Sequence, residues 1–303
     1  MEERNVKRNK KIHKMKGDRS MQIISTVILL TVLIVVGYPV IYVISASFSS
    51  ADALSTGRVL LWPVEFTLEG YRFVMKYKAV WIGFRNSIFY TIGGVSLTMF
   101  LTVLCAYPLS RPDYQGRKII TVVFLITMMV AAGLIPNFLV RSKLGLVGSP
   151  IAVILCGTIS VSQMIILRTA FNSIPRDLYE AATIDGANDF QTLWHVSISL
   201  SKATISVILL YSMVGNWNEY FNSMIYVRDS GLWPLQMVLR NILTGVQSID
   251  TSTVTTDLRS AARSNAEQIQ YAFIIIATVP VLVAYAFSQK NFKKGVMVGS
   301  VKG

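Results

Sequence analysis

The residues whose types and spacing could do chemistry gather in one polar segment, residues 173–191, which separates two long apolar stretches. The segment contains Glu180, two adjacent alanines and then Gly186. Paired alanines give a helix a narrow face that can lie in a cleft of another protein, and Glu180 supplies one charge for a basic residue in that cleft. We therefore predict protein recognition at this segment, and not bond-making chemistry.

The local pattern of this segment predicts two short helices separated by a tight bend. We expect Ser173 to cap the first helix, with Pro175 in its first turn, where a missing amide is tolerated. Gly186 suits the end of that helix, where a left-handed residue commonly follows the last turn. Asn188 and Gln191 are three residues apart and predict a capping box that begins the second helix.

No enzymatic or metal-binding site is predicted from the sequence. His13 lies in a basic N-terminal tail, and we interpret His195 as an interfacial or packing residue. Cys105 and Cys156 lie in apolar runs without a partner for metal binding, so we interpret them as packing residues. The G-x-x-x-x-G-K-[ST] loop that cradles ATP phosphates is absent from the sequence, so any ATP and Mg would be bound by a partner.

The elements that must position the polar segment are long and apolar. The chain is 52% hydrophobic and 15% charged, whereas a soluble domain carries roughly 25% charged residues. Apolar stretches of about 20 residues are long enough to cross a bilayer as helices. We predict an all-α membrane protein with one transmembrane domain over residues 21–289, whose six spans lie at about residues 21–46, 86–109, 119–140, 149–167, 204–227 and 270–288.

The chain has a net charge of +13, and its first 20 residues form a basic tail with many lysines and arginines. A basic tail ahead of a first apolar helix holds that end of the chain in the cytoplasm. It lacks the interleaved aromatics of a nucleic-acid site, and the following apolar run is too long for a signal peptide. Six spans return the tail 290–303 to the same side, so both termini are predicted to be cytoplasmic.

The spacing Glu180-Ala181-Ala182, three residues and then Gly186 resembles the EAA signature of permease subunits in ATP-binding-cassette (ABC) importers. In that family the segment is a coupling helix that lies in a groove of the nucleotide-binding subunit. The family pattern ends in a proline where this chain has Ser199, so a sharp break is not predicted there. The resemblance implies a coupling segment over residues 173–199 with partner contacts at Glu180, Ala181, Ala182, Asp185 and Gly186.

Further stretches are similar to carbohydrate-importer permeases related to the maltose-transporter subunits. They are residues 38–50, 86–118, 217–222 with 233–236, and 295–303. The resemblance implies a six-helix bundle of the type I ABC importer permease kind, without enzymatic activity, in the bacterial cell membrane. It also implies a second homologous permease, two ATPase subunits that bind ATP and Mg, and an extracytoplasmic solute-binding protein.

The expected function is import of a sugar or oligosaccharide by alternating access. Polar groups at membrane depth normally face a cavity or another helix. The predicted substrate pathway consists of Asn137, Gln163, Tyr211, Asn216, Trp217, Asn218, Glu219 and Asn222. These side chains could instead join helices, and the partner permease could hold the substrate. Near the outward ends, carboxylates of uronate-containing sugars could be attracted by Arg85, Arg141 and Lys143, which could equally be interface anchors.

An ion-coupled secondary transporter is the alternative. That class often shows an inverted repeat, interrupted helices and buried carboxylates in both halves. Here Glu219 is the one candidate carboxylate, and no counterpart is found in the other half. A channel would leave the EAA segment without a role. The sequence leaves open the identity of the sugar and the role of the outward segment 228–268.

Overall fold

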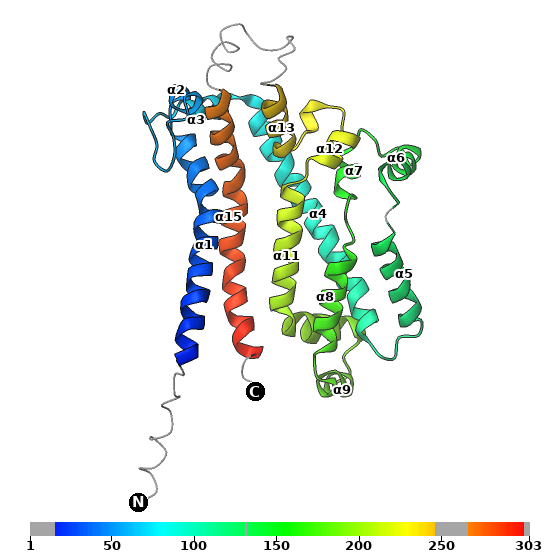
Figure 1. Ribbon diagram of the computed structural model, residues 1–303. Coiled ribbons are helices and arrows are strands. Elements are labelled where there is room, and N and C mark those ends of the chain that lie inside the picture. Colours follow the sequence, from blue (N-terminus) through cyan, green and yellow to red (C-terminus); the bar gives the residue numbers. More distant parts are fainter. Residues whose placement is uncertain (1–15, 131, 246–265, 300–303) are drawn as a thin grey trace, which may run out of the picture.

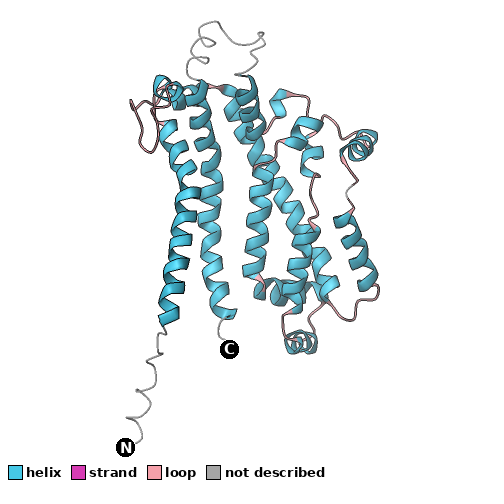
Figure 2. Cartoon of the chain, in the orientation of Figure 1, coloured by secondary structure: helices cyan, strands magenta, loops and turns pink. Residues whose placement is uncertain are grey.

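The computed structural model describes residues 16–130, 132–245 and 266–299, and these form a bundle of helices without a strand (Figures 1 and 2). Three helices contain apolar stretches that are each long enough to cross a membrane. They are α1 (Lys16–Ser47), α4 (Lys78–Ser110) and α15 (Ala266–Gly299). The predicted basic tail lies mostly outside the described residues.

Two further candidate spans are bent, which would bring the number to five. In the first, α5 (Arg117–Met129) and α6 (Leu134–Lys143) meet at an angle of 113°. In the second, the segment Asp189–Ile198 meets α11 (Lys202–Trp217) at 86°. The second bend forms although Ser199 stands in place of the family's proline. The predicted span 204–227 therefore corresponds to a shorter helix that ends at residue 217.

The predicted span 149–167 is also divided. It contains the short helix α7 (Pro150–Ile154) and the start of α8 (Val161–Asn172). Gly157 lies between these helices with a φ of +72°, and Gly133 precedes α6 with a φ of +76°. A positive φ is costly for residues with a Cβ but not for glycine. These glycines allow turns within stretches that hydropathy alone presents as continuous.

The core is organised around α4, which packs against α8, α11 and α13. Its buried face carries small and hydroxyl-bearing residues: Gly83, Ser87, Thr91, Gly94, Thr98, Thr102 and Ala106. Small residues at such spacing let helix backbones approach closely in a membrane. A Cβ at residue 94 would overlap the side-chain amide of Asn216, so glycine sets how closely α4 and α11 approach.

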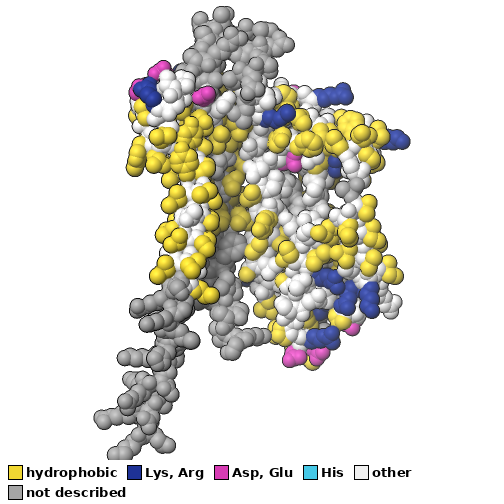
Figure 3. All heavy atoms as spheres, in the orientation of Figure 1, with side chains coloured by type: hydrophobic (Ala, Val, Ile, Leu, Met, Phe, Trp, Pro, Cys, Tyr) yellow, Lys and Arg dark blue, Asp and Glu magenta, His cyan; other side chains and the backbone are white. Residues whose placement is uncertain are grey.

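On the face seen in Figure 3, apolar side chains cover much of the bundle, above all at the side of α1. In the most apolar window of α1 no residue is buried, and Ile34 and Leu29 are 68% and 67% exposed. An exposed apolar surface of this length suits lipid as the solvent.

The remaining elements lie at the two ends of the bundle (Figure 1). The helix α9 (Arg176–Ile184) lies at the end where α1 begins and α15 finishes, which we name the α9 end. The opposite end, named the α13 end, carries α2 (Ala51–Ser55), α3 (Glu69–Lys76), α6, α12 (Phe221–Tyr226), η2 (Ser230–Leu232) and α13 (Leu235–Gly245).

Side chains of α4 hold the segment 231–235 at the α13 end. Asn86 Nδ2 donates hydrogen bonds to the carbonyls of Gly231 and Trp233, at 2.9 and 3.0 Å. Tyr90 donates to the carbonyl of Leu232 at 2.8 Å. These side chains provide hydrogen bonds to non-helical backbone carbonyls that would otherwise lack hydrogen-bond partners. Residues 246–265 of the segment 228–268, which the sequence analysis predicted to be outward, lie outside the described residues.

A loop beside α2 is held by Arg58, whose guanidinium lies 2.6 Å from Asp52 and 2.9 Å from Glu65. A hydrogen bond from Ser50 and the Arg58 guanidinium hold the pKa of Glu65 below its ordinary value. The loop presents Trp62, which is 80% exposed. An exposed tryptophan at the end of the bundle suits the membrane interface.

The close approach of α4 and α11 predicts the effect of Gly94→Val. Its methyl groups would overlap the Asn216 amide and separate the helices, which costs about 1–3 kcal/mol in an overpacked core. We expect a lower thermal unfolding midpoint of the purified chain in detergent. Gly37→Val is the matched control, because no atom lies within 4 Å of a Cβ at that position. Equal midpoints for the two variants would show that the helices do not depend on this contact.

Candidate functional site

The polar segment predicted to bind a partner forms α9 and the turn that follows. The helix begins at Arg176, with Pro175 as its N-cap, and no side-chain hydrogen bond caps it. The predicted cap at Ser173 is wrong: Ser173 ends α8, and its Oγ donates to the carbonyl of Ala170 at 2.8 Å. The reason is Pro175, because a residue that precedes proline is disfavoured in the helical conformation.

The turn after α9 agrees with the prediction. Gly186 has a φ of +78°, and the amide of Ala187 donates to the carbonyl of Ala182 at 2.9 Å. The predicted capping box is confirmed, since Asn188 and Gln191 exchange two hydrogen bonds of 2.9 Å each. It begins α10 (Asp189–Thr192), which continues into η1 (Leu193–Ile198).

The surface of α9 is open. No residue of the helix is buried, and Ile184 at its last position is 86% exposed. The predicted contact residues Glu180, Ala181 and Asp185 are exposed, and Ala182 is half-buried. Figure 3 shows acidic groups gathered at the tip of the α9 end, with lysines and arginines just above them. This surface combines the exposed apolar side chain of Ile184 with acidic groups.

Tyr179 attaches α9 to the bundle. The guanidinium carbon of Arg111 lies 3.9 Å from the centre of its ring. Its hydroxyl lies 3.1 Å from Ser197 Oγ and donates to the carbonyl of Phe171 at 3.4 Å. The sequence analysis missed this residue. The available signal was a single aromatic residue within a short helix that is mostly polar or small.

Arg111 is itself held by aromatic rings. Its guanidinium lies 5.3 Å from the ring centre of Tyr107, whose ring meets that of Phe171 edge-on at 6.4 Å. Among the described residues, no carboxylate lies within ion-pair distance of Arg111, since both ion pairs there involve Arg58. A cation over an aromatic face contributes about 0.5–2 kcal/mol, depending on how far it is desolvated.

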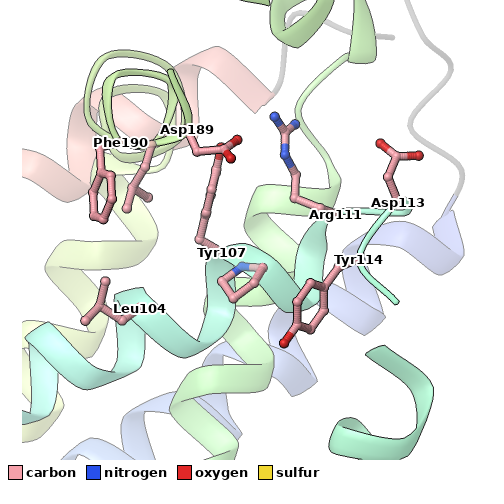
Figure 4. Close-up of a pocket in the computed structure, with 9 residues that line it drawn as sticks. Leu104, Tyr107, Arg111, Asp113, Tyr114, Asp189 and Phe190 are labelled. Atoms are coloured by element: carbon pink, nitrogen blue, oxygen red, sulfur yellow. The ribbon is translucent and has the colours of Figure 1, made fainter. Parts of the chain in front are cut away.

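Arg111 lines two cavities at the α9 end. One, of about 490 Å³, is lined by Leu104, Tyr107, Pro108, Arg111, Asp113, Tyr114, Asp189, Phe190 and Leu193. In Figure 4, Tyr107 extends from α4 toward Asp189, and Phe190 points toward Leu104. The other, of about 510 Å³, lies against α9 and includes Arg117, Arg176 and Glu180.

The structure brings two predicted pathway residues together between α8 and α11. Gln163 Oε1 accepts a hydrogen bond of 3.1 Å from Ser212, and Asn216 Nδ2 donates to the carbonyl of Ser212 at 2.8 Å. Trp217 is buried in the core, where its indole donates to the carbonyl of Ala277 at 2.9 Å. The hydrogen-bonding groups of these side chains are therefore paired with one another or with backbone carbonyls inside the bundle.

Other predicted pathway residues gather where α11 ends. Glu219 accepts hydrogen bonds from the backbone and the side chain of Asn222, at 2.7 and 2.9 Å. Asn218 accepts one of 3.4 Å from Gln236. Tyr211 points away from the core and is 70% exposed. Asn137 is separate from this group, on α6, where it bonds the carbonyl of Gly133 at 2.7 Å.

The candidate anion-attracting residues differ in their surroundings. Arg141 donates to the hydroxyl of Tyr226 at 2.6 Å and also lies 4.8 Å from its ring centre. Arg85 and Lys143 are exposed. His195 is exposed and its Nδ1 lies 3.0 Å from the carbonyl of Gln191. Within the described ranges, no cluster of three or more potential metal ligands is found.

Comparison with known proteins connects this geometry to a family. A family model described as "Binding-protein-dependent transport system inner membrane component" matches residues 88–298. Protein LplC of Bacillus subtilis (strain 168) is 34% identical over 292 residues, covering 96% of this chain and 98% of LplC. The polygalacturonan/rhamnogalacturonan transport system permease protein YtcP of the same organism is 38% identical over 268 residues, covering 88% of this chain and 92% of YtcP.

A solved structure agrees with these relatives. A chain in the crystal structure of a bacterial ABC transporter involved in the import of the acidic polysaccharide alginate matches with a TM-score of 0.82 and 33% identity. The match covers 92% of this chain and 98% of that chain, and it confirms the predicted type I importer permease bundle. This chain therefore belongs to the binding-protein-dependent transport system inner membrane components, the permease subunits of ABC importers.

Proposed function

We propose that this permease imports an oligosaccharide, including acidic, uronate-containing chains, by alternating access that a separate ATPase drives through α9. The observation that carries the proposal is α9 itself: it projects from one end of the bundle, carries the EAA signature and has no buried residue. The substrate class is supported by the names of YtcP and of the alginate importer.

Membership of the family already establishes the general role of the chain. The chain is a non-enzymatic transport component in a bacterial membrane, and it works with a binding protein and other ABC subunits. Nothing in the family supports the ion-coupled alternative. We propose one second homologous permease and two ATPase subunits as the partners, with ATP and Mg bound by the ATPases. The absence of a phosphate-binding loop from this sequence supports that division.

In the proposed mechanism, the ATPase first binds α9. The apolar side chain of Ile184 enters a groove of the ATPase, while Glu180 and Asp185 pair with basic residues at the rim of that groove. ATP binding brings the two ATPases together and carries α9 with them. Because packed helices have discrete arrangements, a displaced α9 shifts the bundle between states that open to opposite sides.

We place the α9 end and both termini in the cytoplasm. The start of α1, the end of α15 and α9 share one end of the bundle (Figure 1). Cytoplasmic segments carry an excess of Lys and Arg. The segments at this end contain Arg111, Arg117, Lys118, Arg168 and Arg176.

We place the substrate pathway along the face of α11 that carries Tyr211, Gly215 and Asn218. All three residues are exposed, and no atom lies within 4 Å of a Cβ at Gly215. Ligand sites commonly combine aromatic surfaces with a few polar groups, and a tyrosine ring with an amide fits a sugar in this way. The opposite face of α11 is occupied by the core contacts of Trp217.

Glu180→Lys tests the role of α9. The reversed charge would repel the basic rim of the groove, so we expect normal membrane insertion with loss of ATP-dependent uptake. The measurement is uptake by the purified complex in proteoliposomes. Glu69→Lys is the control, because Glu69 is also exposed but lies on α3 at the opposite end. Full transport by Glu180→Lys would count heavily against this function.

Gly186→Val and Gly186→Asn test the turn that presents α9. At a φ of +78°, a β-branched side chain costs about 1–2 kcal/mol, whereas asparagine tolerates this region better. We expect less ATPase to co-purify with Gly186→Asn than with the wild-type permease, and least with Gly186→Val. Retention at the wild-type level by Gly186→Val would mean that the conformation of the turn is not needed for docking.

Tyr211→Ala tests the pathway. We expect slower uptake of a labelled oligogalacturonate with the assembled complex intact, because the variant loses an exposed aromatic surface. Tyr285→Ala is the control, since Tyr285 is also exposed, at 50%, but lies on a different helix, α15. Unchanged uptake would remove Tyr211 from the pathway, and a wild-type complex that imported only neutral oligosaccharides would contradict the acidic substrate class.

A further inference from the structure

We propose that Arg111 and Tyr179 form the joint that carries the motion of α9 to the membrane-spanning helices, acting as positioning residues for transport. The inference rests on the proposed function of α9 as the helix gripped by the ATPase. It concerns a different question, namely how a helix that lies outside the bundle can move the bundle.

The first observation is how few contacts hold α9. Across the part of the chain that the structure describes, the side-chain hydrogen bonds and ring contacts that join α9 to other elements all involve Tyr179. The other residues of α9 are mostly exposed, including those assigned to the ATPase groove. A force applied to α9 therefore reaches the bundle mainly through this one side chain and the two ends of the helix.

The second observation is where the contacts of Tyr179 lead. Arg111 is the residue directly after α4, and Phe171 lies in the last turn of α8. Ser197 is fully buried in η1, which continues after a bend into α11. A single tyrosine thus contacts the ends of three elements, and α4, α8 and α11 pack against one another in the core. Movement of the ring displaces these ends together.

The third observation is the type of contact. Arg111 lies over the faces of Tyr179 and Tyr107, and no carboxylate within the described ranges pairs with it. A bidentate ion pair fixes one geometry, whereas a guanidinium over a ring is not tied to fixed hydrogen-bond directions. Arg111 lines both cavities, of about 490 and 510 Å³, and this open space gives the contact room to pivot. The joint can stay closed while its angle changes.

This arrangement separates docking from transmission. Glu180 and Ile184 lie on the exposed surface of α9, whereas Arg111 and the ring of Tyr179 lie between α9 and the bundle. Loss of the joint should leave the ATPase bound and active while less of its motion reaches the helices. The quantity that reports this is the amount of sugar imported for each ATP hydrolysed.

The test uses the complete complex with its own partner subunits in proteoliposomes. Arg111→Met keeps the length of the side chain without its charge, and Tyr179→Leu removes the ring. We expect each to lower sugar imported per ATP by about fivefold, the factor that corresponds to a cation–π contact of intermediate strength. We expect the ATPase to co-purify as with wild type. The double variant should be no worse than Tyr179→Leu alone, because that variant already removes the contact with Arg111.

Two conservative variants and one control sharpen the result. Tyr179→Phe keeps the stacked ring but loses the hydrogen bonds to Ser197 and Phe171. Arg111→Lys keeps the charge but loses the flat guanidinium. For both variants, the sugar imported per ATP should lie between the values for wild type and for the disruptive variants. Arg72→Met is the matched control, because Arg72 is exposed on α3 at the opposite end, and it should import as much sugar per ATP as wild type.

The inference is overturned if Arg111→Met and Tyr179→Leu import as much sugar per ATP as wild type. It is also overturned if they lose the ATPase on purification, since that outcome indicates a merely structural role. Failure of the proposed function looks different: the wild-type complex would show no ATP-dependent uptake, or Glu180→Lys would transport normally. Active wild-type import with full coupling in the two variants removes this inference alone.

Discussion

Lipid gives the helices of this protein no hydrophobic reason to associate, because the hydrocarbon around the bundle is as apolar as the side chains within it. Cohesion must come from close backbone approach and from polar groups that satisfy one another. The buried face of α4 supplies both, with Gly94 against Asn216 and hydroxyl side chains along the same face. The rest of the architecture depends on that one helix face.

The same helix connects the two ends of the molecule. Near its beginning, Asn86 and Tyr90 hold the backbone of the α13 end. Directly after its last residue, Arg111 stacks on Tyr179 of α9. The helix α4 thus joins the surface that we propose meets the ATPase to the opposite end of the bundle. Its face of small and hydroxyl-bearing residues packs against α8 and α11.

Local rules predicted the local features of this protein. The capping box of Asn188 and Gln191 and the turn at Gly186 follow from neighbouring residues, and both are present. The predicted cap at Ser173 was wrong, because Pro175 moves the start of α9 to Arg176. The pairing of Arg111 with Tyr179 could not be predicted, since it joins two distant segments. The burial of Trp217 depends on how α11 is rotated, which a count of polar residues in a span does not reveal.

The interrupted helices give the two flanks of the bundle different surroundings. Between α7 and α8 the chain is not helical, and α5 and α6 meet at a sharp bend. Backbone amides and carbonyls freed by such breaks find no hydrogen-bond partner among acyl chains, so unwound backbone at that depth must face protein or water. The unbroken apolar helix α1 has no such requirement. Hydrocarbon can therefore wet the α1 flank directly, while the flank of broken helices has to be shielded from it.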